Sequence, residues 1–372
     1  MITLVAGTRP NFMKVAPIWR ALRARQMPAE LVHTGQHFDE AMSAVFFRDL
    51  GMAEPDVRLE SGGGTHAEQA AAVLVGVERH LLAKRPGAVV VVGDVTSTMA
   101  AALAAAKLGI PVVHVEAGLR SRDWTMPEEI NRVITDRISD LMLTTSRDAD
   151  ENLAREGVDP ARVRFVGNVM IDSLHYARSR PTGALARFGL QAGGYALATL
   201  HRPANVDTRE ALASTLDALA AISARLPLLF PVHPRTLARA GSLGLAERMR
   251  ATPGLLPIEP LGYNDFVTLM SSARLVATDS GGIQEETTAL GIACLTMRQG
   301  TERPVTVTEG TNVIVGLDRE KIAAAVDDVL AGRGKRGRVP EGWDGQAADR
   351  VAGAIDRLLA GDPPPLTAGA RA

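Results

Sequence analysis

The sequence holds a single cysteine, Cys294, and this scarcity limits the chemistry that the chain can perform. One thiol cannot form an intramolecular disulfide, and it cannot build a metal cluster of the Cys/His type. Cys294 lies in the apolar run Ile292–Leu295, where a thiol behaves as a small hydrophobic side chain. We therefore expect Cys294 to be buried and inert.

Net charge is nearly absent as well. The 41 Lys and Arg residues are offset by 42 Asp and Glu residues, which leaves a formal charge of -1. Such a chain has no bulk attraction for nucleic acid or for an anionic membrane, so neither is expected as a partner. An anionic ligand would instead have to be held by a local group of residues.

Long apolar runs are also missing. No stretch approaches the roughly 18 uninterrupted apolar residues that predict a membrane span. The first ten residues, MITLVAGTRP, lack the basic segment that opens a signal peptide. These absences predict a cytoplasmic protein.

Several cofactor motifs do not occur. The glycine-rich run Ser61–His66 is not followed by Gly-Lys-Ser/Thr, which excludes a P-loop. No Gly-x-Gly-x-x-Gly follows the first apolar run, so tightly bound NAD is not expected. The eight His residues show no metal-binding spacing. We therefore expect no cofactor and no metal.

What the chain does contain is a regular alternation of short β-branched runs and longer helical patterns. Continuous apolar runs such as Ala88–Val92 favour parallel strands that are buried on both faces. Strand–helix alternation of this kind is typical of βαβ units. Strands are expected near Ile2–Ala6, Glu30–His33, Ala88–Val92, Val112–Val115, Leu141–Thr144, Val163–Val166, Tyr195–Leu200, Leu228–Val232, Leu255–Ile258, Leu275–Thr278, Ala293–Thr296 and Asn312–Val315.

The length of 372 residues suits two domains. Segment 178–194 is rich in Arg, Pro and Gly without a clear period, and we expect it to be a linker. The prediction is an α/β protein of two Rossmann-like, doubly wound domains, residues 1–177 and 195–360, with an interdomain cleft. The last expected helix, near Gln346–Leu359, is a candidate to pack back on the first domain. Residues 361–372 are predicted to be a disordered tail.

Ligands of open parallel sheets bind beyond the carboxyl ends of the strands, so polar residues at these positions carry the functional prediction. In the first half, Asp94 and Glu116 follow expected strands, and Glu128 opens an expected helix. Acidic residues in a first helical turn often only complement the helix dipole, which accounts for Glu129 and partly for Glu128. Three carboxylates from three successive loops would converge and prepare one another for proton transfer.

Basic residues are expected on the same edge. Gly7-Thr8-Arg9-Pro10 follows the first strand, and Lys14 comes four residues after Pro10. Proline suits the first turn of a helix, which would place Arg9 and Lys14 at a helix N-terminus that can hold an anion. A solvated loop with a surface lysine is the simpler alternative.

The second half carries its own set of polar residues. His201-Arg202 and His233-Pro234-Arg235 follow two expected strands, and a strand ending at Thr278 runs through Asp279 into Ser280-Gly281-Gly282 at a helix start. Free backbone N–H groups there can bind a diphosphate together with the Ser280 hydroxyl. Glu286, one turn further on, could accept hydrogen bonds from ribose hydroxyls. An ordinary glycine-rich turn with capping carboxylates is the alternative.

Taken in order, these motifs resemble the non-hydrolysing UDP-N-acetylglucosamine 2-epimerase family. The resemblance spans roughly residues 1 to 360, and HVEAGLR together with DSGGIQEE is its most specific part. The matching segments are GTRP with Lys14, TGQH at Thr34–His37, Gly93-Asp94, HVEAGLR at His114–Arg120, PEEINR at Pro127–Arg132, His201-Arg202, PVH at Pro231–His233, DSGGIQEE at Asp279–Glu286 and TERP at Thr301–Pro304.

The resemblance implies a GT-B-like fold and a homodimer that interconverts UDP-N-acetylglucosamine and UDP-N-acetylmannosamine without NAD. The implied route eliminates UDP to give 2-acetamidoglucal and then adds UDP back. The implied catalytic residues are Asp94, Glu116, Glu128 and His201. The implied UDP-sugar-binding residues are Arg9, Lys14, Arg120, Arg132, His233, Tyr263, Phe266, Ser280, Gly281, Gly282, Glu286 and Arg303.

Three departures from the family pattern bear on the substrate. Asn11 stands where the family usually has Glu, and His201–Asn205 (HRPAN) replaces the usual HRRE. Both changes could alter contacts with the sugar or the phosphates. Phe38-Asp39 follows TGQH in place of the usual basic–acidic pair, so we do not expect activation by a second UDP-N-acetylglucosamine.

Alternatives to this function remain open. The chain could be a hydrolysing epimerase or act on a differently substituted UDP-2-acetamido sugar. It could also be a GT-B glycosyltransferase, although sugar transfer does not require acid/base groups around C2. A nucleotide-sugar sensor that lost catalysis is the non-enzymatic reading, and the intact carboxylates Asp94, Glu116 and Glu128 disfavour it.

Overall fold

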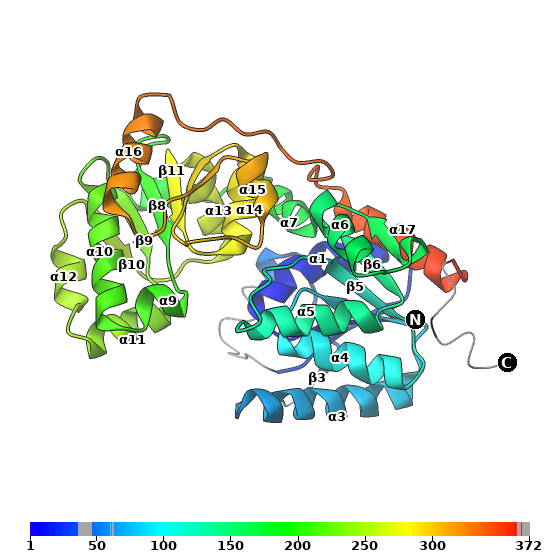
Figure 1. Ribbon diagram of the computed structural model, residues 1–372. Coiled ribbons are helices and arrows are strands. Elements are labelled where there is room, and N and C mark those ends of the chain that lie inside the picture. The colour runs from blue at the N-terminus through cyan, green and yellow to red at the C-terminus, as the bar shows by residue number, and fades with distance from the viewer. Residues whose placement is uncertain (36–46, 60, 62, 363–365, 367–372) are drawn as a thin grey trace. The chain divides into compact units, whose positions relative to one another are not determined.

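The computed structural model describes residues 1–35, 47–59, 61, 63–362 and 366, without the side chains of residues 9 and 10 (Figure 1). The chain divides into two compact units. Unit 1 comprises Met1–His175 and Glu341–Ala372, and unit 2 comprises Tyr176–Pro340. Most of the predicted tail, 361–372, lies outside the described residues.

Unit 1 is built on a seven-stranded sheet in the order β3-β2-β1-β4-β5-β6-β7, and its strand pairs are parallel. The strands are β1 Ile2–Ala6, β2 Ala29–His33, β3 Val57–Arg58, β4 Ala88–Val92, β5 Val112–Ala117, β6 Leu141–Thr144 and β7 Val163–Phe165. The helices are α1 Arg9–Ala24, α3 His66–Lys84, α4 Thr96–Lys107, α5 Pro127–Ile138, α6 Arg147–Arg155, α7 Val169–Arg178 and α17 Ala347–Leu359, with a 3-10 turn at Pro160–Arg162.

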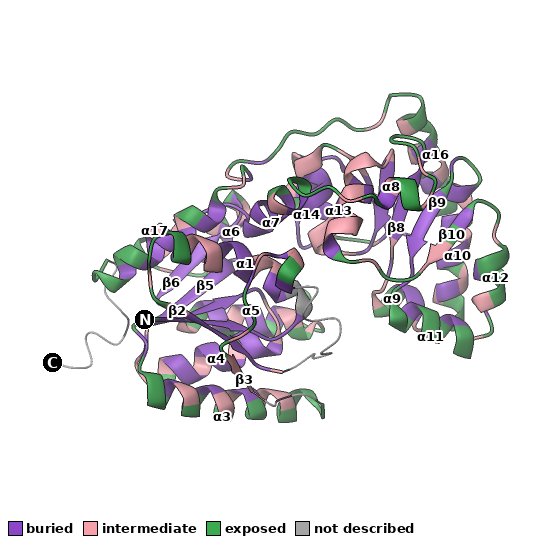
Figure 2. Ribbon diagram, turned by 180° about the vertical axis from the view of Figure 1, so that it is seen from behind, coloured by how far each residue is buried: buried purple, intermediate pink, exposed green. Residues whose placement is uncertain are grey.

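The middle of this sheet forms the core of unit 1. All five residues of β4 are at most 1% exposed, as a strand covered by helices on both faces requires. The alanine-rich helix α4 packs closely against α3, because small side chains allow two helices to approach. Figure 2 shows the sheet buried and the outward helix faces exposed.

Unit 2 repeats the plan with a six-stranded sheet in the order β10-β9-β8-β11-β12-β13, again paired in parallel. The strands are β8 Ala196–Thr199, β9 Leu228–Pro231, β10 Leu255–Ile258, β11 Leu275–Thr278, β12 Ala293–Thr296 and β13 Asn312–Ile314. The helices are α8 Ala184–Arg187, α9 Pro203–Val206, α10 Arg209–Ser223, α11 Pro234–Ser242, α12 Ala246–Ala251, α13 Tyr263–Ser272, α14 Gly281–Leu290, α15 Pro304–Thr308 and α16 Arg319–Leu330. The prediction of an α/β protein with two doubly wound parallel sheets is confirmed.

The buried cysteine is confirmed too. Cys294 in β12 is 1% exposed, and burial raises the pKa of its thiol to about 12. A thiol in this state is a poor nucleophile, because the reactive species is the thiolate.

The end of the chain belongs to unit 1. Helix α17 packs on α1, and its buried face includes Val351, Ile355 and Leu358. The Asp172 carboxylate in α7 accepts hydrogen bonds from the N–H groups of Ala347 and Ala348 at 3.2 and 2.9 Å. These N–H groups have no acceptor inside α17, so Asp172 caps the start of that helix. The structural boundary of unit 2 therefore falls at Pro340, short of the expected residue 360.

Segment 178–194 lies largely in contact with the rest of unit 2. Helix α8 packs on α13, and the Thr182 amide donates to Thr268 Oγ1 at 3.1 Å. The switch between units falls inside α7, after His175. A helix running through a boundary cannot be recognised from Pro and Gly content, which is why the sequence placed the linker later.

Two further details differ from the sequence expectation. The short edge strand β3 has only two residues and gives no alternation that a sequence pattern could reveal. The sequence pattern near Arg235–Arg250 predicts one helix, but the structure has two, α11 and α12, because Gly244 adopts a left-handed φ of +68° between them.

Candidate functional site

Three neighbouring strands of unit 1 bring basic and acidic residues to one edge of the sheet. Strands β1, β4 and β5 are adjacent, and their carboxyl ends lead into the segments holding Lys14, Asp94 and Glu116. Gly7, at the end of β1, has no room for a side chain, since a Cβ there would lie 2.2 Å from Ser97 Oγ. The close approach of these loops explains the glycine.

Glu116 sits on strained backbone. It has a φ of +71°, which a side-chain-bearing residue rarely adopts, and the pairing of β5 with β6 shifts register around it. Its carboxylate is 2% exposed and lies 2.6 Å from Lys14 Nζ. Strain of order 1–3 kcal/mol at one residue typically marks a functional position.

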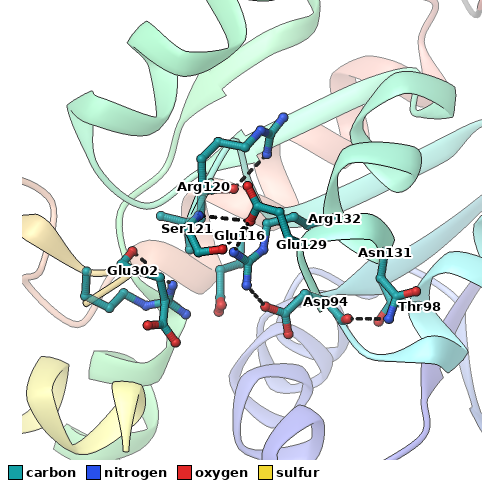
Figure 3. A network of polar contacts seen from close by, with 12 residues as sticks. Asp94, Thr98, Glu116, Arg120, Ser121, Glu129, Asn131, Arg132 and Glu302 are labelled. Carbon is teal, nitrogen blue, oxygen red and sulfur yellow. Dashed lines mark hydrogen bonds and ion pairs between the residues drawn. The ribbon is translucent and has the colours of Figure 1, made fainter. Parts of the chain in front are cut away.

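Asp94 is held by helix α5 (Figure 3). Arg132 forms an ion pair with Asp94 Oδ2, and Asn131 Nδ2 donates to the Asp94 carbonyl at 2.9 Å. The Asp94 side chain remains 24% exposed, whereas that of Arg132 is 3% exposed. The carboxylate is therefore fixed by the protein and still reachable.

The neighbouring acids Glu128 and Glu129 have different environments. Glu129 is buried and accepts hydrogen bonds from Ser121 and from the Arg122 amide, as well as from Arg132. Glu128 is half-buried, and no hydrogen bond or ion pair joins it to another described residue. Of the two, Glu128 is the one available to a ligand.

The first turn of α1 explains one departure from the family pattern. Asn11 Oδ1 accepts from Thr8 at the helix start, and Asn11 Nδ2 donates to the Val92 carbonyl at 2.9 Å. A glutamate could not make the second bond, because a carboxylate has no donor. The side chain of Arg9 lies outside the described part, as do Gln36 to Asp39.

Arg120 is committed to structural partners. Its guanidinium contacts Asp136 at 2.7 Å and Glu156 at 2.6 Å, and its side chain is 3% exposed. Burial alone would lower the Arg120 pKa, but these two carboxylates raise it above the usual value. Asp136 also lies 2.6 Å from His114 Nδ1, and His114 Nε2 donates to the Gly93 carbonyl at 2.9 Å.

In unit 2, Asp279 organises the residues that follow β8. Its buried carboxylate accepts the backbone N–H groups of His201 and Arg202 and the Asn205 amide. His201 Nδ1 lies 3.3 Å from Asp279 Oδ1, and burial lowers the pKa of His201. Asn205, part of the HRPAN departure, also ties this turn to the Met297 carbonyl.

The two histidines predicted from separate motifs lie together. The ring centroids of His201 and His233 are 5.4 Å apart, because β8 and β9 are neighbours. His233 Nδ1 accepts from the Arg235 amide at 3.2 Å, and this fixes its ring at the start of α11.

Helix α14 begins directly at Gly281, after Ser280, and charged side chains gather beside this start. A Cβ on Gly281 would lie 3.6 Å from Glu302 Oε1 and 4.0 Å from Arg303 Cγ. Glu302 pairs with Arg202 at 3.1 Å and with Arg298 at 2.6 Å. Burial opposes ionisation of Glu302, but the surrounding arginines lower its pKa to about 2.

Further along α14, Glu286 is completely buried. The Tyr263 hydroxyl donates to Glu286 Oε1 at 2.7 Å, and Glu286 Oε2 has no hydrogen-bond partner among the described residues. Burial raises the Glu286 pKa to about 8. Phe266, in the next turn after Tyr263, is half-buried. Arg303 pairs with Glu285 at 2.7 Å.

The sequence prediction did not single out several residues that organise these two sets. Asn131 and His114 in unit 1, and Asp279, Arg298 and Glu302 in unit 2, hold the predicted residues in place. Asp279 and Arg298 come just after β11 and β12, so the strand-end rule could have found them. The roles of the others depend on pairings across the fold.

Two features are absent from the described residues. No three or more His, Cys, Asp or Glu side chains are grouped so that they could hold a metal ion. Of the helices in the same part of the chain, none has both the length and the apolar character that a membrane crossing requires.

Comparison with known proteins gives consistent matches. The model of the family described as UDP-N-acetylglucosamine 2-epimerase matches residues 20–356. The UDP-N-acetylglucosamine 2-epimerase of Methanocaldococcus jannaschii is 38% identical over 357 residues, covering 94% of this chain and 97% of that protein. The UDP-2,3-diacetamido-2,3-dideoxy-D-glucuronate 2-epimerase of Pseudomonas aeruginosa is 40% identical over 366 residues, covering 96% and 99%.

A solved structure agrees with these matches. The crystal structure of the Methanocaldococcus jannaschii UDP-GlcNAc 2-epimerase in complex with UDP-GlcNAc and UDP is similar with a TM-score of 0.88 at 37% identity. The similarity covers 96% of this chain and 99% of that one.

Proposed function

Because the chain belongs to the UDP-N-acetylglucosamine 2-epimerase family, we propose that it inverts C2 of a UDP-2-acetamido sugar, with UDP-N-acetylglucosamine and UDP-N-acetylmannosamine as the pair. The observation that carries this proposal is the group of carboxylates at one sheet edge of unit 1, with Glu116 on strained backbone beside Lys14. The predicted family is confirmed; the roles of individual residues are proposals.

The chemistry requires more than one carboxylate. The proton on C2 is weakly acidic, because no carbonyl flanks that carbon. Breaking the bond from C1 to the UDP oxygen makes C2 more acidic, so that loss of UDP and of the proton gives 2-acetamidoglucal. Inversion then requires a proton to leave one face and another to arrive on the opposite face. Asp94, Glu116 and Glu128 are the proposed acid/base groups.

We propose that unit 2 binds the diphosphate. The start of α14 leaves the backbone N–H groups of Gly281 and Gly282 without an acceptor inside the helix, and a helix N-terminus favours an anion. The Ser280 N–H donates to Thr278 Oγ1 at 3.0 Å, so Ser280 would contribute its hydroxyl. The arginines beside this start and the nearby His201 would stabilise the charge that develops on departing UDP. Arg9 and Lys14, both in α1, remain proposed substrate ligands.

The nucleoside is proposed to lie near α13 and α14. The buried Glu286 Oε2 lacks a hydrogen-bond partner in the described structure, and a ribose hydroxyl would satisfy it. Tyr263 fixes the other oxygen of the same carboxyl group. Phe266 is proposed to line the uracil pocket with Tyr263.

The decisive experiment is incubation with UDP-N-acetylglucosamine in D2O. We expect UDP-N-acetylmannosamine to form with deuterium at C2, without added NAD or metal, and proton NMR would detect both changes. Asp94→Asn should lose at least about 100-fold in rate, the lower end of the range for one acid/base group. Recovery of unlabelled starting sugar alone at high enzyme concentration would rule the function out, and free sugar plus UDP would indicate a hydrolysing enzyme.

A second substrate deserves the same assay. The Pseudomonas aeruginosa relative is named for a 2,3-diacetamido uronate, and its identity of 40% is close to the 38% of the archaeal relative. Parallel reactions with UDP-N-acetylglucosamine and with the diacetamido uronate would rank the two by kcat/KM.

The assembly and location of the protein are proposals as well. We propose a homodimer, and the apolar residues that α3 exposes, including Val75 and Leu82, support a contact through this helix. Light scattering on the purified protein and on Val75→Glu would test it. A cytoplasmic location remains a prediction that cell fractionation would check.

A further inference from the structure

The ion pair between Asp94 and Arg132 is unequal in its exposure. The Asp94 side chain is 24% exposed, and that of Arg132 is 3% exposed. One terminal nitrogen of Arg132 contacts Asp94 Oδ2, and the other contacts Glu129 Oε2 at 2.6 Å. The guanidinium is therefore enclosed and engaged on both sides, whereas the carboxylate that it holds is accessible.

Glu129 anchors Arg132 from behind. Its carboxylate accepts the Ser121 amide at 2.9 Å, the Ser121 hydroxyl at 3.0 Å and the Arg122 amide at 2.9 Å. Burial alone would raise the Glu129 pKa, but these N–H and O–H donors and the Arg132 charge lower it. The Glu129 carboxylate is therefore favoured in its ionised form, and its hydrogen bonds to Ser121, Arg122 and Arg132 hold the Arg132 guanidinium in position.

The backbone that carries Asp94 is fixed from two directions. Asn131 Nδ2 donates to the Asp94 carbonyl at 2.9 Å, and His114 Nε2 donates to the Gly93 carbonyl at 2.9 Å. Gly93 has a φ of +71°, which glycine adopts without strain. With Arg132 on its side chain, Asp94 is restrained at both main chain and carboxylate, as a group acting in a defined geometry must be.

We infer that Arg132 is a positioning residue that orients the Asp94 carboxylate as a proton acceptor for C2, in place of a substrate-binding role. This inference rests on the proposed epimerase function. As the C2–H bond breaks, its proton passes to the Asp94 carboxylate and its electron pair forms the C1–C2 double bond. UDP leaves with the electron pair of the C1–O bond.

The charged side chains around this edge of the sheet come from three elements. Arg132, Glu129 and Glu128 lie on α5, Lys14 lies on α1, and Glu116 lies on β5. Lys14 is paired with Glu116 at 2.6 Å, and Arg132 is paired with Asp94. Removing this adjacent positive charge disfavours the ionised form of the carboxylate, so the variant should need a higher pH for full activity.

The test compares Arg132→Gln and Arg132→Lys with Arg137→Gln, an exposed arginine on the same helix. We expect Arg132→Gln to lower kcat by roughly 10- to 100-fold with KM changed less than about threefold, and to move the acidic limb of the kcat/KM profile upward by about 1 pH unit. Arg132→Lys should recover part of the rate. Arg137→Gln should match the wild type.

Glu129→Gln is the second variant, because it leaves Arg132 in place and removes only its charged anchor. It should shift the pH profile in the same direction by a smaller amount. Both variants are checked by circular dichroism, so that a loss of folding is recognised as such.

The outcomes separate the inference from the function. A KM raised more than about tenfold at unchanged kcat would return Arg132 to substrate binding and overturn the inference. A slower but folded Arg132→Gln variant with an unshifted pH profile would also overturn it. If the wild-type protein incorporated no deuterium at C2 of the sugar, the proposed function itself would be ruled out.

Discussion

At the scale of the residue, this protein places ionisable groups in surroundings that change their protonation. Glu302 is kept ionised by arginines, with a pKa of about 2, whereas burial raises the pKa of Glu286 to about 8. Two glutamates in the same unit thus differ in charge near neutral pH, because Glu302 has cations beside it, whereas Glu286 is completely buried and has the carboxylate of Glu285 nearby.

Glu286 gives a prediction for stability. A carboxyl group whose pKa is raised on folding stabilises the folded state below its unfolded pKa of about 4.5, and this contribution is lost as pH rises through about 8. Glu286→Gln cannot ionise, so the free energy of unfolding of the variant relative to the wild type should increase by roughly 2–4 kcal/mol from pH 5 to pH 9. Urea denaturation at both pH values measures it.

Glu320→Gln is the matched control, because Glu320 is exposed in the first turn of α16. The free energy of unfolding of Glu320→Gln relative to the wild type should be almost the same at pH 5 and at pH 9. A wild type and a Glu286→Gln variant whose stabilities change in parallel from pH 5 to pH 9 would mean that Glu286 ionises normally in the folded protein.

At the scale of the element, the start of α1 joins a helix to a neighbouring strand. Asn11 accepts from Thr8 as a cap, and its amide reaches the Val92 carbonyl at the end of β4. Its position beside Gly93 means that the same residue supports both the helix and the turn that carries Asp94.

Asn11→Ala removes both contacts. We expect the free energy of unfolding to fall by about 1–2 kcal/mol, which is the usual cost of a lost cap together with a buried hydrogen bond. The loss is limited because Thr98 Oγ1 also donates to the Val92 carbonyl. Lys107→Ala, at the exposed end of α4, is the control and should be neutral within about 0.5 kcal/mol.

The predicted elements show why sequence patterns succeed for some segments. Runs such as Val89–Val92 are short, β-branched and apolar over their full length, and this combination favours a parallel strand that is buried on both faces. The two-residue strand β3 and the break at Gly244 carry no such pattern, because one is set by its neighbour β2 and the other by a single backbone angle.

At the scale of the whole molecule, the last helix of the chain completes the first unit. Helix α17 buries Val351, Ile355 and Leu358 in unit 1, and the segment before it is fixed by Trp343 Nε1, which donates to the Thr145 carbonyl at 3.0 Å. Unit 1 therefore depends on residues that follow unit 2 in the sequence.

A chain that ends at Pro340 should therefore fail to fold unit 1, and we expect it to aggregate or to lose cooperative unfolding. Ile355→Asp should destabilise the full chain by several kcal/mol, since it buries an unpaired charge. Arg357→Ala, on the exposed side of the same helix, should leave the melting temperature almost unchanged. A truncated chain that melts cooperatively like the intact protein would contradict this dependence.

The sequence by itself determined the α/β class, the two-sheet plan, the family and the segments from which functional side chains come. These properties are local, since hydrophobic period, strand-end residues and motif order can all be read along the chain. Only the tertiary structure decided that Arg132 and Arg120 lie against carboxylates, that Lys14 pairs with Glu116 and that Tyr263 contacts Glu286. These contacts join residues of different helices, strands and loops, so they depend on the order of the strands in the sheet and on how the helices pack over them.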